Sequence, residues 1–220
     1  MNTEFESSLS DKDINIIDPF TGTGTFIVRL IQSGIIGKKD LKRKFSSELH
    51  ANEIVLLAYY IGAINIESAF ADATGEYEPF NGIVLTDTFQ MFESEDSLDL
   101  NVFKENNARA DIQKKKELRV IIGNPPYSIG QTSANDDNAN FVYEDLDQSI
   151  RQTYVKKSNS NTVRSMYDPY IRAFKWASNR LKDEGIICFV SNGGFIRTKS
   201  ADGFRKSLLD EFTSVYVFDL

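Results

Sequence analysis

Short apolar runs alternate along this chain with segments whose apolar residues recur at the spacing of a helix. The apolar runs predict six strands, at residues 14–17, 45–51, 83–86, 120–123, 186–190 and 214–218. Helices are expected between them, at about residues 25–32, 53–66, 169–181 and 203–212. Because short buried strands joined by helices are typical of parallel sheets, the pattern predicts an α/β fold with a doubly wound, mostly parallel sheet.

The segment 128–166 departs from this alternation, because it is polar, rich in Asn, Asp and Ser, and weakly patterned. Connections of this length are usually functional loops or disordered segments. Since the segment comes soon after the fourth expected strand, we expect a flexible loop that covers or contacts a substrate, with plain disorder as the alternative. Residues 1–13 are expected to form a polar tail. The rest of the chain, 14–220, has enough apolar residues for one domain with one core.

Composition excludes several classes of protein and of site. The chain has no run of 18 apolar residues and no apolar N-terminal segment, so we expect neither a membrane span nor a signal peptide. Cys188 and His50 are its single cysteine and single histidine. They argue against a disulfide framework, a zinc site and a Cys–His nucleophile pair, so no metal is expected. A reducing cytoplasm suits such a chain.

The formal net charge of −7 is unfavourable for DNA binding, because Lys and Arg supply much of the affinity for phosphates. Basic residues nevertheless cluster at 38–44, 114–116 and 156–157. Charge runs of this kind are usually solvated faces. If the chain acts on DNA, we expect the main DNA-binding surface to lie elsewhere.

A turn with two glycines links the first expected strand to the first expected helix, in the sequence Asp18-Pro-Phe-Thr-Gly-Thr-Gly-Thr-Phe26. Gly22 and Gly24 permit backbone conformations that side chains would block, and the helix N-terminus offers N–H groups to an anion. The turn lacks the lysine of a Walker loop and the third glycine of a dinucleotide fingerprint. With Asp18 it suits a ligand that carries a carboxylate and an ammonium group. A simple strand-to-helix turn is the alternative.

Acidic residues lie at the ends of the second and third expected strands. Glu53 can accept hydrogen bonds from both hydroxyls of a ribose, or it can be an ordinary first-turn glutamate with Asn52 as the N-cap. Asp87 can accept a hydrogen bond from an adenine amino group while Phe89 packs on the ring, or it can be a surface aspartate in a turn. The pattern leaves both interpretations open.

The tetrad Asn124-Pro125-Pro126-Tyr127 follows the fourth expected strand. Two consecutive prolines remove two backbone donors and stiffen the turn, which leaves nearby carbonyls free to accept hydrogen bonds. The Asn124 amide oxygen can accept another, and the Tyr127 ring offers an apolar face to a planar base. The tetrad could therefore bind an exocyclic amine. The alternative is a turn that only ends the strand.

Other residues are interpreted as structural. His50 is expected to be a strand-end residue without a chemical role. Four aromatic residues recur at helical spacing and predict core packing rather than base stacking; they are Tyr167, Tyr170, Phe174 and Trp176. Phe195 follows two glycines after the fifth strand, so it either projects into the ligand crevice or packs under its loop.

Taken in order, the 18–26 motif, Glu53, Asp87 and the tetrad resemble the S-adenosylmethionine-dependent N6-adenine DNA methyltransferases, in the gamma arrangement. The segments 51–67, 167–181, 185–196 and 201–220 further resemble the methyltransferase region of single-chain type ISP and type IIG restriction–modification enzymes. The resemblance covers nearly all of the chain from about Asp13. It implies a Rossmann-like class I methyltransferase fold in the bacterial cytoplasm.

The resemblance also implies a cofactor site for S-adenosyl-L-methionine. Asp18 and the loop from Gly22 to Gly24 would hold the methionine part, Glu53 the ribose and Asp87 the adenine. The remaining residues expected in this site are Phe20, Thr25 and Thr88.

The same resemblance assigns the tetrad to catalysis. A target adenine would be flipped out of the DNA duplex, because its amino group is unreachable in the stack. Asn124 and the Pro125 carbonyl would accept hydrogen bonds from N6, with Pro126 completing the turn. Tyr127 and Phe195 would stack on the base.

Two departures from the family pattern suggest a core fragment of a longer enzyme. Gamma enzymes carry a further cofactor-contacting motif upstream, and they continue into a seventh strand and a target-recognition domain that binds double-stranded DNA. By this interpretation the sheet lacks the seventh strand, and helicase or nuclease modules are fused in the parent protein. Two alternatives remain open: a truncated, inactive module with the methyltransferase fold, and a methyltransferase that acts on RNA or on a protein glutamine.

Overall fold

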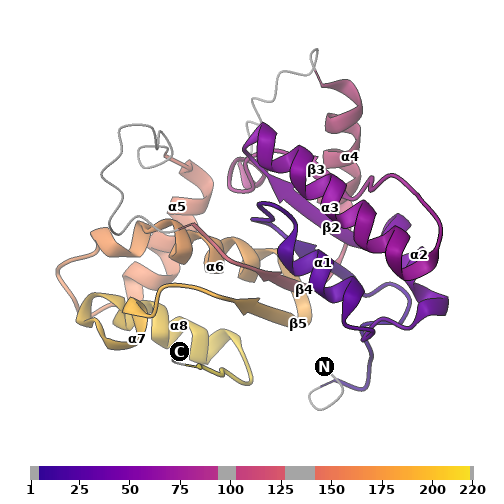
Figure 1. Ribbon diagram of the computed structural model, residues 1–220. Helices are drawn as coiled ribbons and strands as arrows, with labels where there is room; N and C mark the ends of the chain where they lie inside the picture. Colours follow the sequence, from indigo (N-terminus) through magenta and orange to yellow (C-terminus); the bar gives the residue numbers. More distant parts are fainter. Residues whose placement is uncertain (1–4, 94–102, 127–141, 219–220) are drawn as a thin grey trace. The chain divides into compact units, whose positions relative to one another are not determined.

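The computed structural model describes residues 5–93, 103–126 and 142–218, and the chain divides into two compact units (Figure 1). The first consists of Met1–Met91, Asp96–Asn124 and Arg180–Phe189, and we call it the sheet unit. The second consists of Phe92–Glu95, Pro125–Asn179 and Val190–Leu220, and we call it the helical unit.

Five strands of the described residues form one parallel sheet in the sheet unit. They are β1 (Asn15–Asp18), β2 (Leu49–Glu53), β3 (Ile83–Leu85), β4 (Leu118–Gly123) and β5 (Leu181–Phe189), in the order β3-β2-β1-β4-β5. The chain runs outward from β1 to β3 and then returns to place β4 on the other side of β1. This reversal confirms the predicted doubly wound parallel sheet, and ligands of such sheets bind beyond the carboxyl ends of the strands at the reversal.

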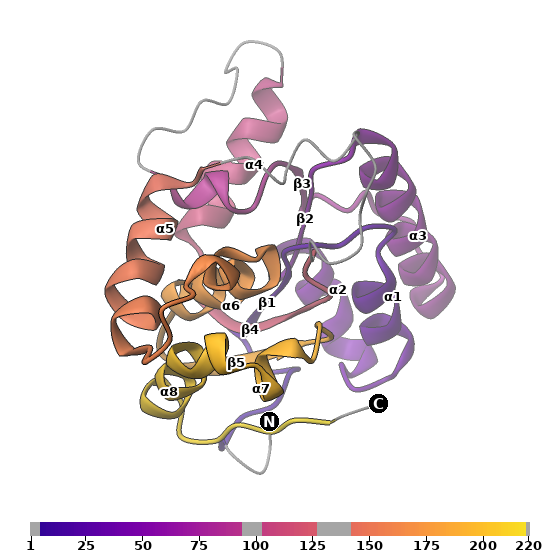
Figure 2. The same cartoon turned by 90° about the vertical axis from the view of Figure 1, so that its left-hand side faces the viewer.

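Helices cover the sheet on both sides. They are α1 (Thr25–Gln32), α2 (Lys38–Ser47), α3 (Leu56–Thr74), the short 3-10 helix η1 (Gln90–Phe92) and α4 (Lys104–Lys115). The first three share one buried apolar cluster with the strands, to which they contribute Ile27, Phe45 and Ile66. Figure 2 shows α4 on the opposite side of the strands from α3.

The helical unit is built around aromatic side chains. Its elements are α5 (Glu144–Ile150), the π-helical η3 (Arg151–Val155), η4 (Arg164–Tyr167), α6 (Pro169–Arg180), α7 (Gly194–Arg197), η5 (Lys199–Ala201) and α8 (Asp202–Glu211). Tyr170 is buried and Phe174 packs on the fully buried Phe204. The prediction that the aromatic residues of α6 belong to the core is confirmed, since Trp176 is also buried.

The basic segment 38–44 belongs to a helix that the sequence analysis did not predict. Within α2, Leu41 and Phe45 are buried, and Phe45 stacks on Phe70 with ring centroids 3.9 Å apart. The predicted second strand at 45–51 therefore begins too early, because its first residues continue α2 and β2 starts at Leu49. Helix α4 was missed as well, because its sequence is polar almost throughout.

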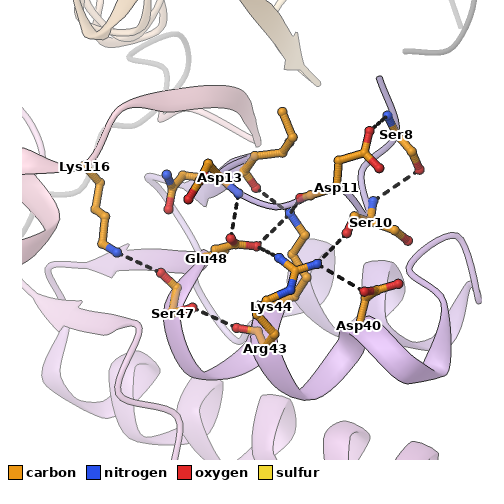
Figure 3. Close-up of polar contacts among 12 residues, drawn as sticks. Ser8, Ser10, Asp11, Asp13, Asp40, Arg43, Lys44, Ser47, Glu48 and Lys116 are labelled. Atoms are coloured by element: carbon orange, nitrogen blue, oxygen red, sulfur yellow. Dashed lines mark hydrogen bonds and ion pairs between the residues drawn. The ribbon is translucent and has the colours of Figure 1, made fainter. Parts of the chain in front are cut away.

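A buried lysine of α2 holds the segment that leads into β1 (Figure 3). The Lys44 side chain is fully buried, and its ammonium group donates to the carbonyls of Asp11 at 2.6 Å and Ile14 at 2.8 Å. Its charge is balanced by Glu48, 2.9 Å away, which also pairs with Arg43. The described part of the predicted polar tail is thus bonded to α2, so a run of basic residues here serves the fold.

The sixth predicted strand is wrong. Residues 212–218 form no strand, and the side chains from Val215 to Phe218 are exposed. An apolar run becomes a strand only where a neighbour accepts and donates the ladder hydrogen bonds, and the described sheet ends at β5. The fifth strand begins earlier than predicted, because Leu181 pairs with Leu118 before the ladder shifts and resumes between Ile186 and Val120.

The expectation of a long loop at 128–166 is wrong for the residues that the structure describes. From residue 142 onward this segment contains α5, η3 and η4. Leu146, Ile150 and Tyr154 recur every fourth residue and are fully buried. Polar residues separate these three buried residues, so the apolar stripe of the helix is only one residue wide and gives a weak pattern in the sequence. Residues 128–141 lie outside the described part of the chain.

In the parts of the chain that the structure describes, we find no helix that combines the length and the apolar character needed to cross a membrane.

The face that α3 turns to the sheet can be tested with two isoleucines of the same helix. Ile66 is fully buried, so Ile66→Ala should lower the free energy of unfolding by about 2–5 kcal/mol, through lost burial and the cavity left behind. Ile64 is 63% exposed, and Ile64→Ala should change it by less than about 1 kcal/mol. Urea denaturation measures both values. Similar losses from the two variants would contradict this orientation of α3.

Candidate functional site

The predicted cofactor residues lie at one edge of the sheet unit, where neighbouring parallel strands end. Asp18 is the last residue of β1 and Glu53 the last residue of β2. Asp87 follows β3, and Asn124 follows β4 directly. Because all these strands are parallel and adjacent, their carboxyl ends meet at the same edge. The structure therefore brings together four strand ends that are far apart in sequence.

The turn after β1 is held against the end of β2 by backbone hydrogen bonds. The Thr21 N–H donates to the Asn52 carbonyl at 2.9 Å, and the Gly22 N–H donates to Glu53 Oε2 at 2.7 Å. The other oxygen of Glu53 accepts from the Val55 N–H at 2.7 Å. Glu53 thus bonds to the turn after β1 and to Val55, the N-cap of α3. Each of its carboxylate oxygens can still accept a hydrogen bond from a further donor.

The two glycines of this turn serve different purposes. Gly24 has φ of 90°, and a Cβ there would lie 3.0 Å from the Ile66 side chain and 3.1 Å from the Gly62 carbonyl. Packing against α3 therefore accounts for Gly24. Gly22 has φ of 54°, and a Cβ there would meet nothing within 4 Å. The surface above Gly22 is open, as a loop that receives a ligand requires.

Asp18 is a fully buried carboxyl group with an incomplete set of partners. Its Oδ1 accepts from the Phe20 N–H at 3.1 Å, while Oδ2 makes no hydrogen bond of good geometry among the described residues, although the Thr21 hydroxyl lies near enough to lower the pKa of the carboxyl. Burial raises the pKa of Asp18 to about 7, with a smaller contribution from the negative charge of Glu53. A buried carboxyl group without a partner destabilises the fold, so its presence at a strand end points to a ligand.

Asp87 and three aromatic residues complete the edge. Asp87 Oδ1 accepts from the Phe89 N–H at 2.9 Å, which caps η1. Phe89 is buried, and its ring centroid lies 5.5 Å from that of Phe20, which in turn lies 6.3 Å from Phe189. Phe20 is half-buried, so it retains ring surface that Phe89 lacks. Thr25, at the start of α1, is exposed.

The tetrad crosses the division between the two units. Asn124 is exposed and closes the sheet unit, while Pro125 is buried and Pro126 exposed in the helical unit. Tyr127 lies outside the described residues. Phe195 belongs to the helical unit, where its ring packs near Phe174 and Phe204 at centroid distances of 6.0 and 5.3 Å. The packing interpretation of Phe195 is thus supported within its unit.

Three features of the edge were missed by sequence reasoning. Gly123 is required because a Cβ there would lie 2.8 Å from Asp18 Oδ1, a close approach that no sequence pattern announces. Ile54, the next residue after Glu53 in the sequence, has an exposed apolar side chain. Asn52 is fully buried within β2, and its interpretation as a helix N-cap is wrong, because α3 begins at Leu56 with Val55 as its N-cap. His50 is structural as predicted: it is buried, lies 3.2 Å from Asn15 Oδ1, and burial lowers its pKa to about 3.

The raised pKa of Asp18 predicts a pH dependence of stability. The carboxyl releases its proton at about pH 7 in the folded chain, against an ordinary value of 3.8. Between these values only the folded chain binds the proton, so stability falls as pH rises, by at most about 1.4 kcal/mol per pH unit. Asp18→Asn should flatten this slope and be more stable than wild type at pH 8.

Urea denaturation between pH 4 and 8 measures the slope. The control is Asp72→Asn, which alters an exposed carboxylate on α3 and should keep the wild-type slope. An unchanged slope in Asp18→Asn would contradict the burial of a carboxyl group that is protonated at neutral pH.

Comparison with known proteins identifies the family. A family model described as Eco57I restriction-modification methylase matches residues 38–220. The chain is similar to the Type ISP restriction-modification enzyme LlaGI, solved as a nuclease-deletion mutant in complex with a DNA substrate mimic, with 52% identity and a TM-score of 0.89 over 96% of the chain. It is also similar to the ATP-dependent Type ISP enzyme LlaBIII bound to DNA and to the DrdV–DNA complex, with 47% and 44% identity and TM-scores of 0.86 and 0.84. Each of these two matches covers 94% of the chain.

The solved relatives are much longer than this chain, which spans 18% of LlaGI, 15% of LlaBIII and 20% of DrdV. The family model covers well over half of the 220 residues, and its range includes β2 to β5 and the tetrad. Together with the parallel sheet and its edge of strand-end residues, these matches make the chain a member of the Eco57I restriction-modification methylase family.

Proposed function

We propose that the sheet unit binds S-adenosyl-L-methionine at the carboxyl ends of its strands, and that the chain takes part in transferring the methyl group to N6 of an adenine in DNA. The observation that carries the proposal is the unpartnered, buried Asp18 carboxyl beside an open glycine turn and a strand-end glutamate. Membership of a family of restriction-modification methylases supports this reading of the edge.

The residues at the end of β1 fit the methionine part of the cofactor. Asp18 Oδ2 can accept a hydrogen bond from the ammonium group, which would give the buried carboxyl its missing partner and favour its charged form. The eight-residue helix α1 begins at Thr25 and directs free N–H groups toward the same turn, where a carboxylate is favoured. Gly22 leaves the approach open, and Phe20 supplies apolar surface.

The ends of β2 and β3 fit the nucleoside part. Both oxygens of Glu53 already accept one backbone N–H each, and their remaining lone pairs suit the two ribose hydroxyls. Ile54, the next residue in the sequence, has an exposed apolar side chain, which suits the face of a planar base. Asp87 can accept from the adenine amino group, as its place after β3 suggests.

Methyl transfer to an exocyclic amine requires positioning more than acid–base chemistry. The cofactor supplies an electrophilic methyl group. Asn124 is exposed at the end of β4, and its amide oxygen can accept a hydrogen bond from N6, as can the carbonyl of Pro125. These acceptors orient the lone pair of the amine toward the methyl group. Tyr127 and Phe195 remain the predicted stacking partners of the flipped base.

DNA binding is proposed to involve more than this chain. Its net charge of −7 gives little attraction for a polyanion. The relatives solved with DNA are at least five times as long as the part that this chain matches. We infer that a target-recognition domain supplies the affinity for double-stranded DNA, and that helicase or nuclease modules accompany it in a longer protein.

Removing the Asn124 amide should abolish transfer without affecting cofactor binding. Asn124→Ala is expected to lower the rate of methyl transfer to DNA by about a hundredfold or more, because it deletes an acceptor that orients the amine. The dissociation constant for S-adenosylmethionine should change less than about twofold, since Asn124 lies on another strand end. Transfer of a radiolabelled methyl group and calorimetry measure the two quantities.

The control for this variant is Asn81→Ala, which removes an exposed asparagine from the segment leading into β3 and should leave transfer unchanged. The assay is run with DNA, RNA and a glutamine-containing peptide, because acceptance of RNA or peptide alone would refute the DNA substrate. Wild-type rates in Asn124→Ala would remove the tetrad from the proposed mechanism.

Glu53→Gln tests the ribose site. A glutamine has one oxygen for the two N–H donors that Glu53 accepts, so its NH2 group must face either Gly22 or Val55. We expect the dissociation constants for S-adenosylmethionine and for adenosine to rise by about tenfold or more. Calorimetry with both ligands measures the effect.

Glu67→Gln is the matched control for Glu53→Gln. Glu67 also serves two donors, the Tyr77 hydroxyl at 3.0 Å and the Phe80 N–H at 2.9 Å, but it lies in the middle of α3. This variant should bind both ligands as tightly as wild type. Equal weakening by the two substitutions would mean that loss of stability, and not a ribose contact, explains the result.

A further inference from the structure

Asn52 is a buried polar residue that no step of the proposed function uses. It is fully buried, and its carbonyl accepts the Thr21 N–H at 2.9 Å. Its side-chain NH2 group donates to Thr88 Oγ1 at 3.2 Å and lies 3.6 Å from Met91 Sδ. Asn52 therefore bonds to the turn after β1 through its main chain, and to the segment after β3 through its side chain.

Thr88 continues the same chain of hydrogen bonds. Its hydroxyl donates to the Pro19 carbonyl at 2.6 Å and accepts from Asn52, so both functions of the hydroxyl are satisfied within the protein. Thr88 is only 4% exposed. This leaves little of its side chain to contact a cofactor, although the family resemblance had implied such a contact.

We propose that Asn52 and Thr88 form a latch, a pair of positioning residues that holds the turn 19–22 in its ligand-binding shape without touching the cofactor. The proposal rests on the cofactor site proposed above and adds to it the residues that set its geometry. Four of the groups assigned to the cofactor are next in sequence to a member of this network: Asp18 to Pro19, Gly22 to Thr21, Glu53 to Asn52 and Asp87 to Thr88.

The energetics of Asn52 favour a geometric role over a stabilising one. Its Oδ1 has no hydrogen-bond partner among the described residues, although the side chain is fully buried. Burying an unsatisfied amide oxygen opposes folding, and an apolar residue at this position would avoid that penalty. The amide's contribution lies in the NH2 group, which bonds β2 to the Thr88 hydroxyl in the segment after β3.

A latch of this kind affects binding through preorganisation. Loops at strand ends are ordinarily more mobile than the strands, and ordering them on binding lowers the affinity. Because the turn 19–22 is already held by Asn52, Thr88 and Glu53, little ordering remains when a ligand arrives. Loss of one hydroxyl in such a buried network leaves two other groups unsatisfied.

The test compares Thr88→Val, which keeps the shape but removes the hydroxyl, with Thr88→Ser, which restores it. In the ligand-free protein, the amides of Thr21 and Gly22 should exchange with solvent about tenfold faster in Thr88→Val than in wild type. The dissociation constant for S-adenosylmethionine should rise by a similar factor. Thr88→Ser should return both quantities to within about threefold of wild type.

The matched control is Thr74→Val. Thr74 donates its hydroxyl to the Phe70 carbonyl at 2.8 Å in the last turn of α3, away from the strand ends, so neither quantity should change. Faster exchange throughout the sheet in Thr88→Val, or unchanged affinity despite faster exchange of the turn, would overturn the proposal. Either result would show that Thr88 stabilises the fold without positioning the site.

If Thr88→Val does not fold, amide exchange in the wild-type protein tests the proposal. In the latched turn, the ligand-free Thr21 and Gly22 amides should exchange far more slowly than the amides of an exposed segment such as 212–218. Exchange at the rate of that segment would overturn the latch. If wild type fails to bind S-adenosylmethionine, the proposed function fails, while slow exchange of the same amides would still establish the latch as a feature of the fold.

Discussion

The hydrogen bond from the Gly22 N–H to the Glu53 carboxylate is the contact on which the arrangement of the site depends. It joins the ends of β1 and β2, which are neighbours in the sheet although 31 residues separate the two groups in sequence. A charged acceptor shortens and strengthens such a bond, and the turn's amide has no helix to satisfy it. The glycine turn therefore takes its shape from the next strand and not from its own sequence.

The buried carboxyl group of Asp18, at the same edge of the sheet, lowers the stability of the fold. Asp18 is buried with one oxygen unpartnered among the described residues, and its pKa is raised to about 7 by burial. Gly123 allows this burial, because any side chain there would collide with the carboxyl. Proteins retain such groups where a ligand completes the set of partners, so the destabilising feature and the proposed cofactor site coincide.

The proposed chemistry divides between the two units. The cofactor residues Asp18, Gly22, Glu53 and Asp87 all belong to the sheet unit, in which hydrogen bonds join the loops to one another. The boundary within the tetrad falls between Asn124 and Pro125, one of several points at which the chain passes from one unit to the other.

Local sequence determined the elements that bury a dense apolar run. The strands β1, β3 and β4 and the helix α1 follow from such runs, and the 18–26 motif with the tetrad identified the family. Only the tertiary structure decided the rest. Lys44 is buried in α2 because carbonyls 30 and 33 residues away accept hydrogen bonds from its ammonium group, and 214–218 is not a strand because no neighbour pairs with it among the described residues. Thr88 and Asn52 gain their roles from partners that sit 69 and 36 residues away, and a contact of that kind leaves no periodic pattern in a sequence.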